Sequence, residues 1–314
     1  MDKKKIFITG GTGFLGSAVL KYLVKNNYEI MATMRTETDM FRFKTFSDEV
    51  KWINTDDENY KKQIIAFEPT IIFHAAWSGV TSSDRNDWSK QIQNFQLLAD
   101  ILDIANNVKL EKILVLGSQS EYGNVHTRVN ENHPTDAREA YAVSKNAMQN
   151  IIEKYCNQYN IEWYWLRVFS VFGPGETKNW FIPWVIVNQL KNNDTNLTLC
   201  EQQYDYLYIS DFVKMIIQII NATKSASGIY NICSGNSTIL KTIVEYIKQC
   251  IGSSAKINYG AIPYRPNQSM QITGDNSKYN INFGRVDLTE FEHAMNLTIS
   301  YYKEQYLSDN NMGL

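Results

Sequence analysis

The chain has 314 residues, of which 44% are hydrophobic and 20% are charged, and its formal net charge at pH 7 is −2. This composition supports one large domain or two unequal ones, and gives no indication of binding to nucleic acid or an anionic membrane surface. The four cysteines have no C-x-x-C spacing and the four histidines are scattered, so we expect neither a disulfide framework nor a metal site. No apolar run is long enough for a signal peptide or a membrane span, and we expect a cytoplasmic protein.

The first half of the chain alternates between segments of strand type and segments of helical type. Since the strand-like runs are almost entirely apolar, we expect an α/β fold with a parallel sheet that is covered on both faces. Apolar residues at helical spacing predict helices at residues 14–26, 86–107 and 138–156. Short apolar runs predict strands at residues 5–9, 28–34, 50–54, 70–74, 112–116 and 161–168.

The character of the sequence changes after the stretch RVFSVFGPGE at residues 167–176. The loops become longer, and Asn and Tyr become frequent. We therefore predict a first domain at residues 1–171 and a smaller lobe at residues 172–314, with a partial return to the first domain around residues 205–233. Shorter elements are predicted at residues 207–210, 211–220, 228–232 and 239–250.

The stretch ITGGTGFLG at residues 8–16 has three spaced glycines between a predicted strand and a predicted helix. Glycine lets the backbone turn sharply and lets a pyrophosphate approach, while the helix N-terminus supplies free N–H groups and partial positive charge. Glycine-rich turns are common, but this one follows the first strand of an alternating pattern, which favours dinucleotide binding over a plain turn. The predicted cofactor contacts are Gly10, Gly13, Phe14, Leu15 and Gly16.

The end of the second predicted strand indicates the type of dinucleotide. NAD sites usually have an acidic residue there, whereas this chain has Arg35, whose guanidinium suits the 2′-phosphate of NADP(H). The alternative interpretation is that Arg35 is an ordinary exposed arginine. Glu37 and Asp39 are near enough to bind a ribose, so NAD(H) stays possible. After the third strand, Asp56 is our candidate for the adenine edge in preference to Asp57, although both residue types are also common in turns.

The stretch AYAVSK at residues 140–145 places Tyr141 and Lys145 four residues apart on a predicted helix. They therefore share one face of the helix. A nearby ammonium favours the phenolate and lowers the pKa of the phenol, which can then exchange a proton with a carbonyl or a hydroxyl group. Most Tyr–Lys pairs at this spacing lie on the solvated surface of a helix. The pair therefore indicates a reaction site only in combination with other motifs.

These motifs occur in one order and at compatible spacings. ITGGTGFLG is followed by HAA at residues 74–76, by GSQSEYG at residues 117–123, by YAVSK and by RVFSVFGPGE. Together they resemble the extended short-chain dehydrogenase/reductase family, in its branch of nucleotide-sugar epimerases, dehydratases and ketoreductases, over nearly the whole chain. The resemblance implies a Rossmann-type doubly wound parallel sheet that binds NAD(P), a smaller C-terminal lobe that binds a nucleotide sugar, and a Ser–Tyr–Lys site.

The resemblance also implies a role for each residue of that site. Ser118 orients the substrate oxygen, Tyr141 is the general acid and base, and Lys145 binds the nicotinamide ribose and keeps the pKa of the tyrosine low. Ser170 stands where the family often has asparagine, so no polar role is carried over to it. The further cofactor contacts that the resemblance implies are Ala75, Ala76 and Phe169.

The stretch GSQSEYG separates the possible reactions. Sugar-nucleotide dehydratases of the family resemble S-T-D-E-V-Y-G here, and their Asp–Glu pair moves the protons of water elimination. Aligned on Gly123, this chain has Gln119 and Ser120 at those two places, and Glu121 is displaced by one residue. Dehydration therefore lacks its carboxylates, and hydride and proton transfer remain.

The second half of the chain resembles the substrate segments of the family. YDYLYISD resembles R-D-F-x-Y-V-x-D with Tyr204 in place of the arginine, and IPYRPNQSM resembles a segment whose arginine contacts the diphosphate. Arg265 is the candidate for the contact with the diphosphate, and the alternative is that it is an ordinary surface arginine. Trp180 either stacks on the nucleotide base or packs against the protein. The predicted substrate contacts are Ser78, Ser118, Ser120, Asn179, Trp180 and Arg265.

The leading hypothesis is an NADPH-dependent reductase of nucleotide-linked 4-keto-6-deoxy sugars in surface-polysaccharide biosynthesis, similar to the CDP-abequose and CDP-paratose synthase group. The first alternative is a nucleotide-sugar 4-epimerase that retains NAD, although this reading prefers an acid after the second strand. The second alternative is a non-catalytic NADP-binding sensor, although such relatives usually lose the Tyr–Lys pair.

The resemblance also implies a homodimer in which the helices at residues 86–107 and 138–156 of each subunit pair about a two-fold axis. Both stretches have apolar residues on more than one face. The alternative is that these residues pack on the chain's own sheet. They include Phe95, Leu98, Ile101, Met148 and Ile152.

Overall fold

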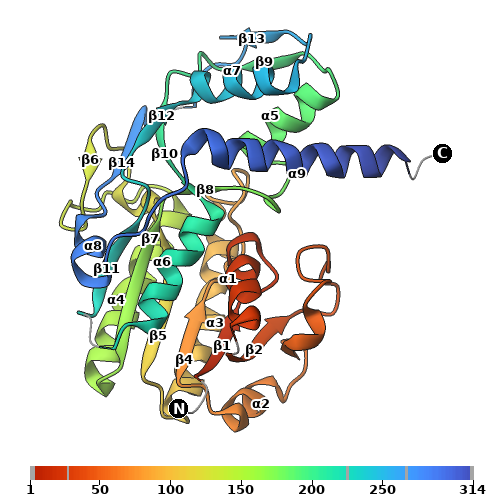
Figure 1. Ribbon diagram of the computed structural model, residues 1–314. Helices are drawn as coiled ribbons and strands as arrows, with labels where there is room; N and C mark the ends of the chain where they lie inside the picture. Colours follow the sequence, from red (N-terminus) through yellow and green to blue (C-terminus); the bar gives the residue numbers. More distant parts are fainter. Residues whose placement is uncertain (1–3, 27, 224–225, 266–267, 312–314) are drawn as a thin grey trace.

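The fold was obtained as a computed structural model that describes residues 4–26, 28–223, 226–265 and 268–311. Its centre is a parallel sheet of seven strands in the order β11-β7-β5-β4-β1-β2-β3 (Figure 1). This confirms the predicted α/β class with a doubly wound parallel sheet. Its strands are β1 (Lys5–Thr9), β2 (Glu29–Met34), β3 (Lys51–Asn54), β4 (Ile71–His74), β5 (Lys112–Ser118), β7 (Glu162–Val168) and β11 (Gly228–Ile232).

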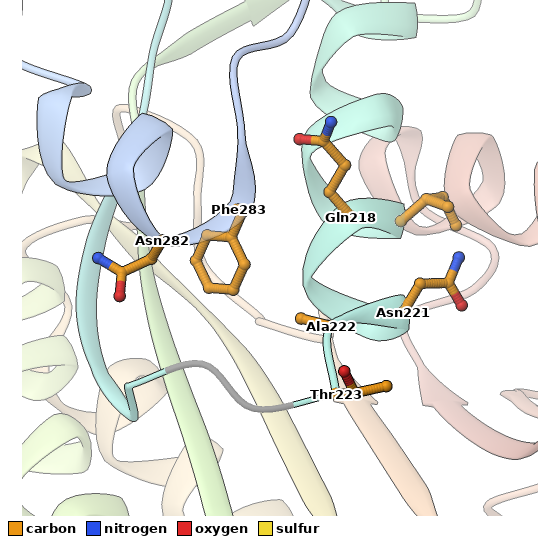
Figure 2. A pocket seen from close by; sticks show the side chains of 7 residues that line it. Gln218, Asn221, Ala222, Thr223, Asn282 and Phe283 are labelled. Atoms are coloured by element: carbon orange, nitrogen blue, oxygen red, sulfur yellow. The ribbon is translucent and has the colours of Figure 1, made fainter.

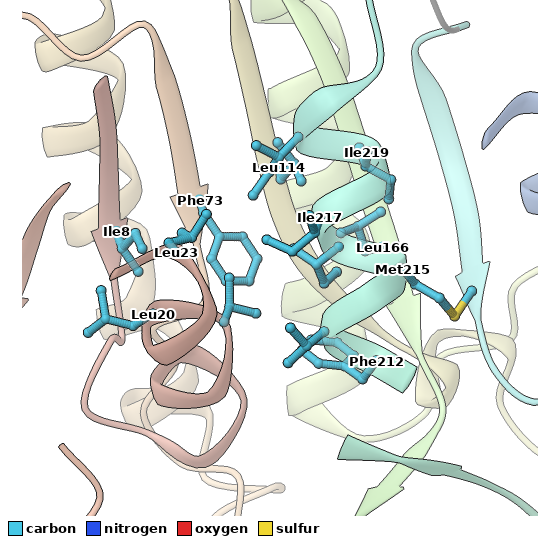
Figure 3. Packing of buried hydrophobic residues seen from close by; sticks show 14 of the residues in the cluster. Ile8, Leu20, Leu23, Phe73, Leu114, Leu166, Phe212, Met215, Ile217 and Ile219 are labelled. Atoms are coloured by element: carbon cyan, nitrogen blue, oxygen red, sulfur yellow. The ribbon is translucent and has the colours of Figure 1, made fainter. Parts of the chain in front are cut away.

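Helices cover both faces of this sheet, because alternate strand residues point to opposite sides. On β1, Ile6 and Ile8 belong to the core cluster under α1 and α6, whereas Phe7 belongs to the cluster under α2, α3 and α4. Figure 3 shows the first cluster, in which α1 and α6 side chains meet those of the strands. These helices are α1 (Phe14–Lys25), α2 (Tyr60–Phe67), α3 (Trp88–Asn106), α4 (Ala140–Tyr159) and α6 (Ile209–Asn221).

The smaller lobe has its own sheet and a layer of three packed helices. The strand order is β12-β10-β14-β6, with β8 paired to β10. Helices α5, α7 and α9 pack together around a separate apolar core, and α9 lies along this layer (Figure 1). The strands are β6 (Arg128–Val129), β8 (Ser170–Phe172), β9 (Thr195–Leu197), β10 (Gln203–Tyr208), β12 (Ser237–Ile239), β13 (Ile257–Tyr259) and β14 (Gln271–Gly274). The helices are α5 (Phe181–Leu190), α7 (Leu240–Ile251), α8 (Ser277–Phe283) and α9 (Phe291–Asn311), and short 3-10 turns occur at Ser47–Glu49 and Gln119–Tyr122.

The chain crosses between the two parts more than once. Helix α6 covers the large sheet and β11 is its edge strand, although both follow residue 171. The division at residue 171 and the return around residues 205–233 both stay predictions.

The apolar residues proposed for a dimer interface are mostly core residues. Leu98, Ile101, Met148 and Ile152 are each at most 2% exposed and pack in the cluster on the chain's own sheet, with Phe95 partly buried beside them. These residues therefore pack on the chain's own sheet, as the alternative interpretation expected, because they occupy the sheet-facing side of α3 and α4.

Two surface pockets lie on helices that cover the large sheet. One, of about 430 Å³, lies at the C-terminal end of α6 and includes Gln218, Asn221 and Phe283 (Figure 2). Lys4 donates from Nζ to the carbonyl of Ile220 next to it, which places this pocket at the amino end of β1. The other lies on the surface of α3. Among the described helices, none has both the length and the hydrophobicity that a membrane span requires.

Candidate active site

The turn after β1 brings two backbones into close contact. Gly10 has φ +72°, and a Cβ there would lie 2.5 Å from the backbone nitrogen of Ala76 and 2.7 Å from the carbonyl carbon of Ala75. The amide of Ala75 donates to the carbonyl of Thr9 over 3.1 Å. The predicted cofactor residues Gly10, Ala75 and Ala76 are therefore together, and only glycine fits at the first of them.

The N-terminus of α1 is open to an anion. Gly13 is its N-cap and makes no side-chain cap, and the first turn, which begins with Phe14 and Leu15, has no acidic residue. Gly16 packs on Gly10 so closely that a Cβ would collide with the carbonyl oxygen of that residue. Free first-turn amides and the helix dipole fit the diphosphate of a dinucleotide.

The ends of β2 and β3 are tied together by a carboxylate. Asp56 accepts hydrogen bonds from the amide of Thr36 over 3.1 Å and from its hydroxyl over 2.8 Å, and these bonds hold the pKa of Asp56 below its usual value. Arg35, which directly precedes Thr36, is exposed, and its guanidinium has no hydrogen-bond partner among the described residues. The adenosine end of the predicted site thus has one fixed carboxylate and one available guanidinium.

The three predicted catalytic residues meet at the carboxyl end of β5. Ser118 is the last residue of that strand, and Tyr141 and Lys145 lie in the first two turns of α4, which packs on it. All three are buried, and the hydroxyl of Ser118 is near enough to the phenol to help lower the pKa of Tyr141, against the larger effect of burial. Lys145 donates from Nζ to the carbonyl of Leu116 over 2.6 Å.

Lys145 lies closer to Trp77 than to Tyr141, and its expected roles toward the ribose and the tyrosine stay predictions. Its ammonium lies 3.6 Å from the centroid of the Trp77 ring, against 5.8 Å from that of Tyr141. Burial lowers the pKa of Lys145 to about 7, and the charge of Glu121 opposes this. Burial also raises the pKa of Tyr141, and the largest opposing effect is the charge of Arg85.

Glu121 points into the protein, where buried donors hold its carboxylate. It is fully buried and accepts hydrogen bonds from the amide of Ser118 over 2.7 Å and from Nε of Arg167 over 2.8 Å. The indole of Trp165 donates to it as well, over 3.0 Å. In return, the hydroxyl of Ser118 accepts from the amide of Ser120, which completes a capping box. The stretch GSQSEYG therefore forms a structural cap that includes the predicted catalytic serine, and its one carboxylate is part of the cap.

Arg85 is a site residue that the sequence reasoning missed. It lies in the loop between β4 and α3 and donates from Nη2 to the hydroxyl of Ser120 over 2.6 Å. Its Nε donates to the carboxylate of Glu139 over 2.7 Å, and its Cζ lies 4.3 Å from the centroid of the Tyr141 ring. No motif surrounds Arg85, so sequence offered no signal beyond its place after HAA.

Two buried amides on α3 hold the loop that follows β4. Gln91 accepts from the indole of Trp77 over 2.8 Å and donates to the carbonyl of Gly79 over 2.7 Å. Asn94, three residues further on the same face, accepts from the amide of Ser78 over 2.7 Å. Ser78 itself is exposed. The sequence contained a signal for Gln91 and Asn94, since polar side chains on the buried face of a predicted helix usually form hydrogen bonds within the protein.

Trp77 lies between α3 and the predicted catalytic residues Tyr141 and Lys145. Its ring lies edge-on to Tyr141, with the centroids 5.8 Å apart, and under the ammonium of Lys145. It therefore forms one wall of the space next to the catalytic residues.

Phe169 is buried near the carboxyl end of β7. Its side chain is 3% exposed and belongs to a small core cluster with Tyr122, Val125 and Cys233. The expected contact between Phe169 and a cofactor stays a prediction.

The predicted substrate residues of the smaller lobe are on its surface. Asn179 and Trp180 immediately precede α5, and both are exposed. Arg265 is exposed too, and its charge helps to lower the pKa of Tyr204, which burial raises. Pro266 and Asn267 of the same predicted segment lie outside the described residues.

No group of three or more His, Cys, Asp or Glu side chains forms a metal-binding arrangement in the described parts of the chain. The four cysteines are free.

Comparisons with known proteins agree with this geometry. Residues 6–233 match the NAD dependent epimerase/dehydratase family. The chain is 29% identical to CDP-abequose synthase of Salmonella muenchen, over 87% of this chain and 90% of the relative. It is 25% identical to a putative UDP-glucose 4-epimerase of Methanocaldococcus jannaschii, over 81% and 85%.

Among solved structures, a UDP-glucuronic acid 4-epimerase mutant from Bacillus cereus, in complex with a UDP-sugar and NAD, superimposes with a TM-score of 0.87. The match covers 96% of this chain and all of the other at 20% identity, so it supports the fold alone.

Proposed function

The chain belongs to the NAD dependent epimerase/dehydratase family, and from that premise we propose that it uses NADPH to reduce a nucleotide-linked 4-keto-6-deoxy sugar for surface polysaccharide. The coarser statement, an NAD(P)-dependent enzyme of oxidoreductase type, follows from the family and the relatives. The observation that carries the finer proposal is the Ser118–Tyr141 pair with Glu121 turned into the protein. No carboxylate is left in that stretch for dehydration.

The residues of the chain suit proton transfer to a carbonyl oxygen. Ser118 holds the substrate oxygen and Tyr141 gives it a proton, while a bound nicotinamide supplies the hydride for the carbonyl carbon. The ammonium of Lys145 would bind a ribose hydroxyl of the nicotinamide nucleotide, and its charge would compensate the phenolate that remains after proton transfer. Trp77 lies beside both Lys145 and Tyr141.

The dinucleotide is proposed to lie along the carboxyl edge of the large sheet. Its diphosphate would be held at the open N-terminus of α1, above Gly10 and the backbone of Ala75. Arg35 supports a preference for NADP(H), because no acidic residue stands at the end of β2 to accept from the ribose. Asp56, next to it, is proposed for the adenosine end.

The nucleotide sugar is proposed to bind between this edge and the smaller lobe. Arg265 is the candidate for its diphosphate, and Trp180 is the candidate for stacking on the base. Ser78 and Ser120 are proposed for the sugar hydroxyls, and Asn179 for the nucleotide. A cytoplasmic location stays a prediction from the sequence.

A 4-epimerase is the second candidate function. It needs the same Ser–Tyr–Lys residues, and epimerases are among the relatives and the solved neighbours. The absence of an acidic residue directly after β2 argues against it. The sensor hypothesis is weaker, because Ser118, Tyr141 and Lys145 are present and assembled.

The test is an assay of nicotinamide absorbance with 4-keto-6-deoxy sugars linked to CDP, dTDP, GDP and UDP, with NMR of the product. We expect one NADPH oxidised for each sugar reduced. Tyr141→Phe should lower turnover about a hundredfold or more, because general acid catalysis is lost, and leave NADPH binding intact. Tyr159→Phe, an exposed tyrosine at the end of the same helix, is the matched control. Interconversion of two hydroxylated nucleotide sugars without net NADPH consumption would establish the epimerase instead.

A further inference from the structure

We propose that Arg85 is a positioning residue for Tyr141: its guanidinium favours the phenolate form of that side chain and holds the ring toward Ser118. The proposal rests on the proposed function for the identity of the reaction, but its effect on the phenol can be measured without any substrate.

Arg85 is the nearest cation to the tyrosine ring. Its Cζ is 4.3 Å from the ring centroid, whereas the Nζ of Lys145 is 5.8 Å away and lies closer to Trp77. A cation over an aromatic face is attracted to it, and the attraction grows when the ring becomes negatively charged. The two residues are also joined through the backbone, because the amide of Tyr141 donates to the carbonyl of Arg85 over 2.8 Å.

The guanidinium is held in this place by fixed partners. Nε donates to Glu139, the N-cap of α4, and Nη2 donates to the hydroxyl of Ser120. The loop before it is fixed as well, since Gln91 donates to the carbonyl of Asp84 over 3.1 Å. Arg85 thereby connects the loop after β4, the turn after β5 and the start of α4, which are the three segments around the tyrosine.

The balance of charges around Tyr141 makes this cation important. Two cations act on the ring, Arg85 and Lys145, and two anions oppose them, Glu121 and Glu139. Glu121 is paired with the buried Arg167, and Glu139 is paired with Arg85 itself. Loss of the guanidinium removes one cation and leaves Glu139 without its partner, so both changes disfavour the phenolate.

The experiment places 3-fluorotyrosine at position 141 alone and follows its fluorine NMR signal against pH. This phenol ionises at lower pH than that of tyrosine, so its midpoint is measurable in the folded protein. Arg85→Met should raise the midpoint by about one pH unit or more. Arg85→Lys should restore part of the shift. Glu139→Gln should move the midpoint down, and this opposite sign separates an effect of charge from general loosening of the loop.

Arg138→Met is the matched control, because Arg138 is exposed and pairs with Asp136. It should leave the midpoint unchanged. If Arg85→Met leaves the midpoint where it is, or if Glu139→Gln and Arg85→Met shift it in the same direction, the proposal is wrong. Turnover is measured in parallel, and its dependence on pH should move with the midpoint while KM changes little. If Arg85→Met shifts the midpoint but the protein reduces no 4-keto sugar, the proposed role of Arg85 is supported and the proposed function is overturned.

Discussion

At the scale of single residues, Arg35 is the side chain that should choose between the two dinucleotides. Its guanidinium is available and no carboxylate directly follows β2. We predict that Arg35→Ala weakens NADPH binding by about ten- to a hundredfold, because a charge-assisted phosphate contact is lost, and changes NADH binding little. Calorimetric titration of both cofactors measures this, with Arg138→Ala as the control. Equal binding of both cofactors by the unaltered protein would contradict the prediction.

Glu121 is the residue on which the turn after β5 depends for stability. Its carboxylate pairs with Arg167, which is itself 3% exposed. We predict that Glu121→Gln lowers the free energy of unfolding by about 3–5 kcal/mol, because it leaves the buried guanidinium without its counter-charge. Urea denaturation followed by circular dichroism is the measurement.

The neighbouring Gln119 provides the control for that variant. Its buried Oε1 has no hydrogen-bond partner, so Gln119→Ala should change stability by less than about 1 kcal/mol. A loss as large as that of Glu121→Gln would mean that the turn is sensitive to any change, and that the ion pair is not the cause.

At the scale of elements, the connection from β8 to α5 contains a carboxyl group that the fold keeps protonated. Oε2 of Glu176 is buried and has no hydrogen-bond partner in the part of the chain that the structure describes, and burial raises the pKa of this side chain from 4.5 to about 8. The backbone of the same segment is held by two hydrogen bonds, since Tyr302 of α9 donates to the carbonyl of Glu176 and Arg42 donates to that of Gly175.

This burial predicts a stability that depends on pH. Below pH 4.5 the carboxyl is protonated in both the folded and the unfolded chain and has no effect. Between about 4.5 and 8 the unfolded chain loses its proton first, so the folded state loses stability as the pH rises, by at most about 5 kcal/mol in total. Glu176→Gln should therefore be more stable than the unaltered protein at pH 8 and similar to it at pH 4.5. Urea denaturation at the two pH values measures the difference, and an equal effect at both would contradict it.

The elements that the sequence predicted are those with a clear local pattern. The sheet strands and the helices α1, α3 and α4 combine apolar periodicity with adequate length, and their observed bounds lie close to the predicted ranges. Helix α5 was not predicted, because its sequence FIPWVIVNQL is apolar on nearly every side and includes a proline. Short strands such as β6 and β14 were not predicted either, since they form through pairing with strands that are distant in the chain.

At the scale of the whole molecule, the outer sides of α3 and α4 are candidates for a homodimer interface. Trp88 and Ile92 of α3 are 54% and 58% exposed, and Ile151 of α4 is 39% exposed. The two helices pack side by side, so these residues are on one side of the subunit, and a hollow next to Ile92 is lined by Phe95 and polar residues. The interface proposed here uses these outer residues in place of the core residues expected from sequence.

We predict a dimer at micromolar concentration that Ile92→Arg converts into a monomer, because an unpaired charge would be buried in a self-complementary interface at two equivalent places. Analytical ultracentrifugation measures the mass. Ile281→Arg is the control, since Ile281 is 83% exposed on α8. A monomeric unaltered protein would exclude the interface.

Local patterns were sufficient for the fold class of this protein and for a hypothesis about its chemistry. A glycine turn between strand and helix, and a tyrosine and a lysine four residues apart, act through backbone geometry that neighbouring residues impose on each other. By contrast, the place of Arg85 over Tyr141, the pairing of Glu121 with Arg167 and the burial of the Phe169 ring join segments that are far apart in the chain. Only packing in three dimensions decides such contacts, because their energy depends on which side chains share a buried space, and sequence spacing contains no record of that.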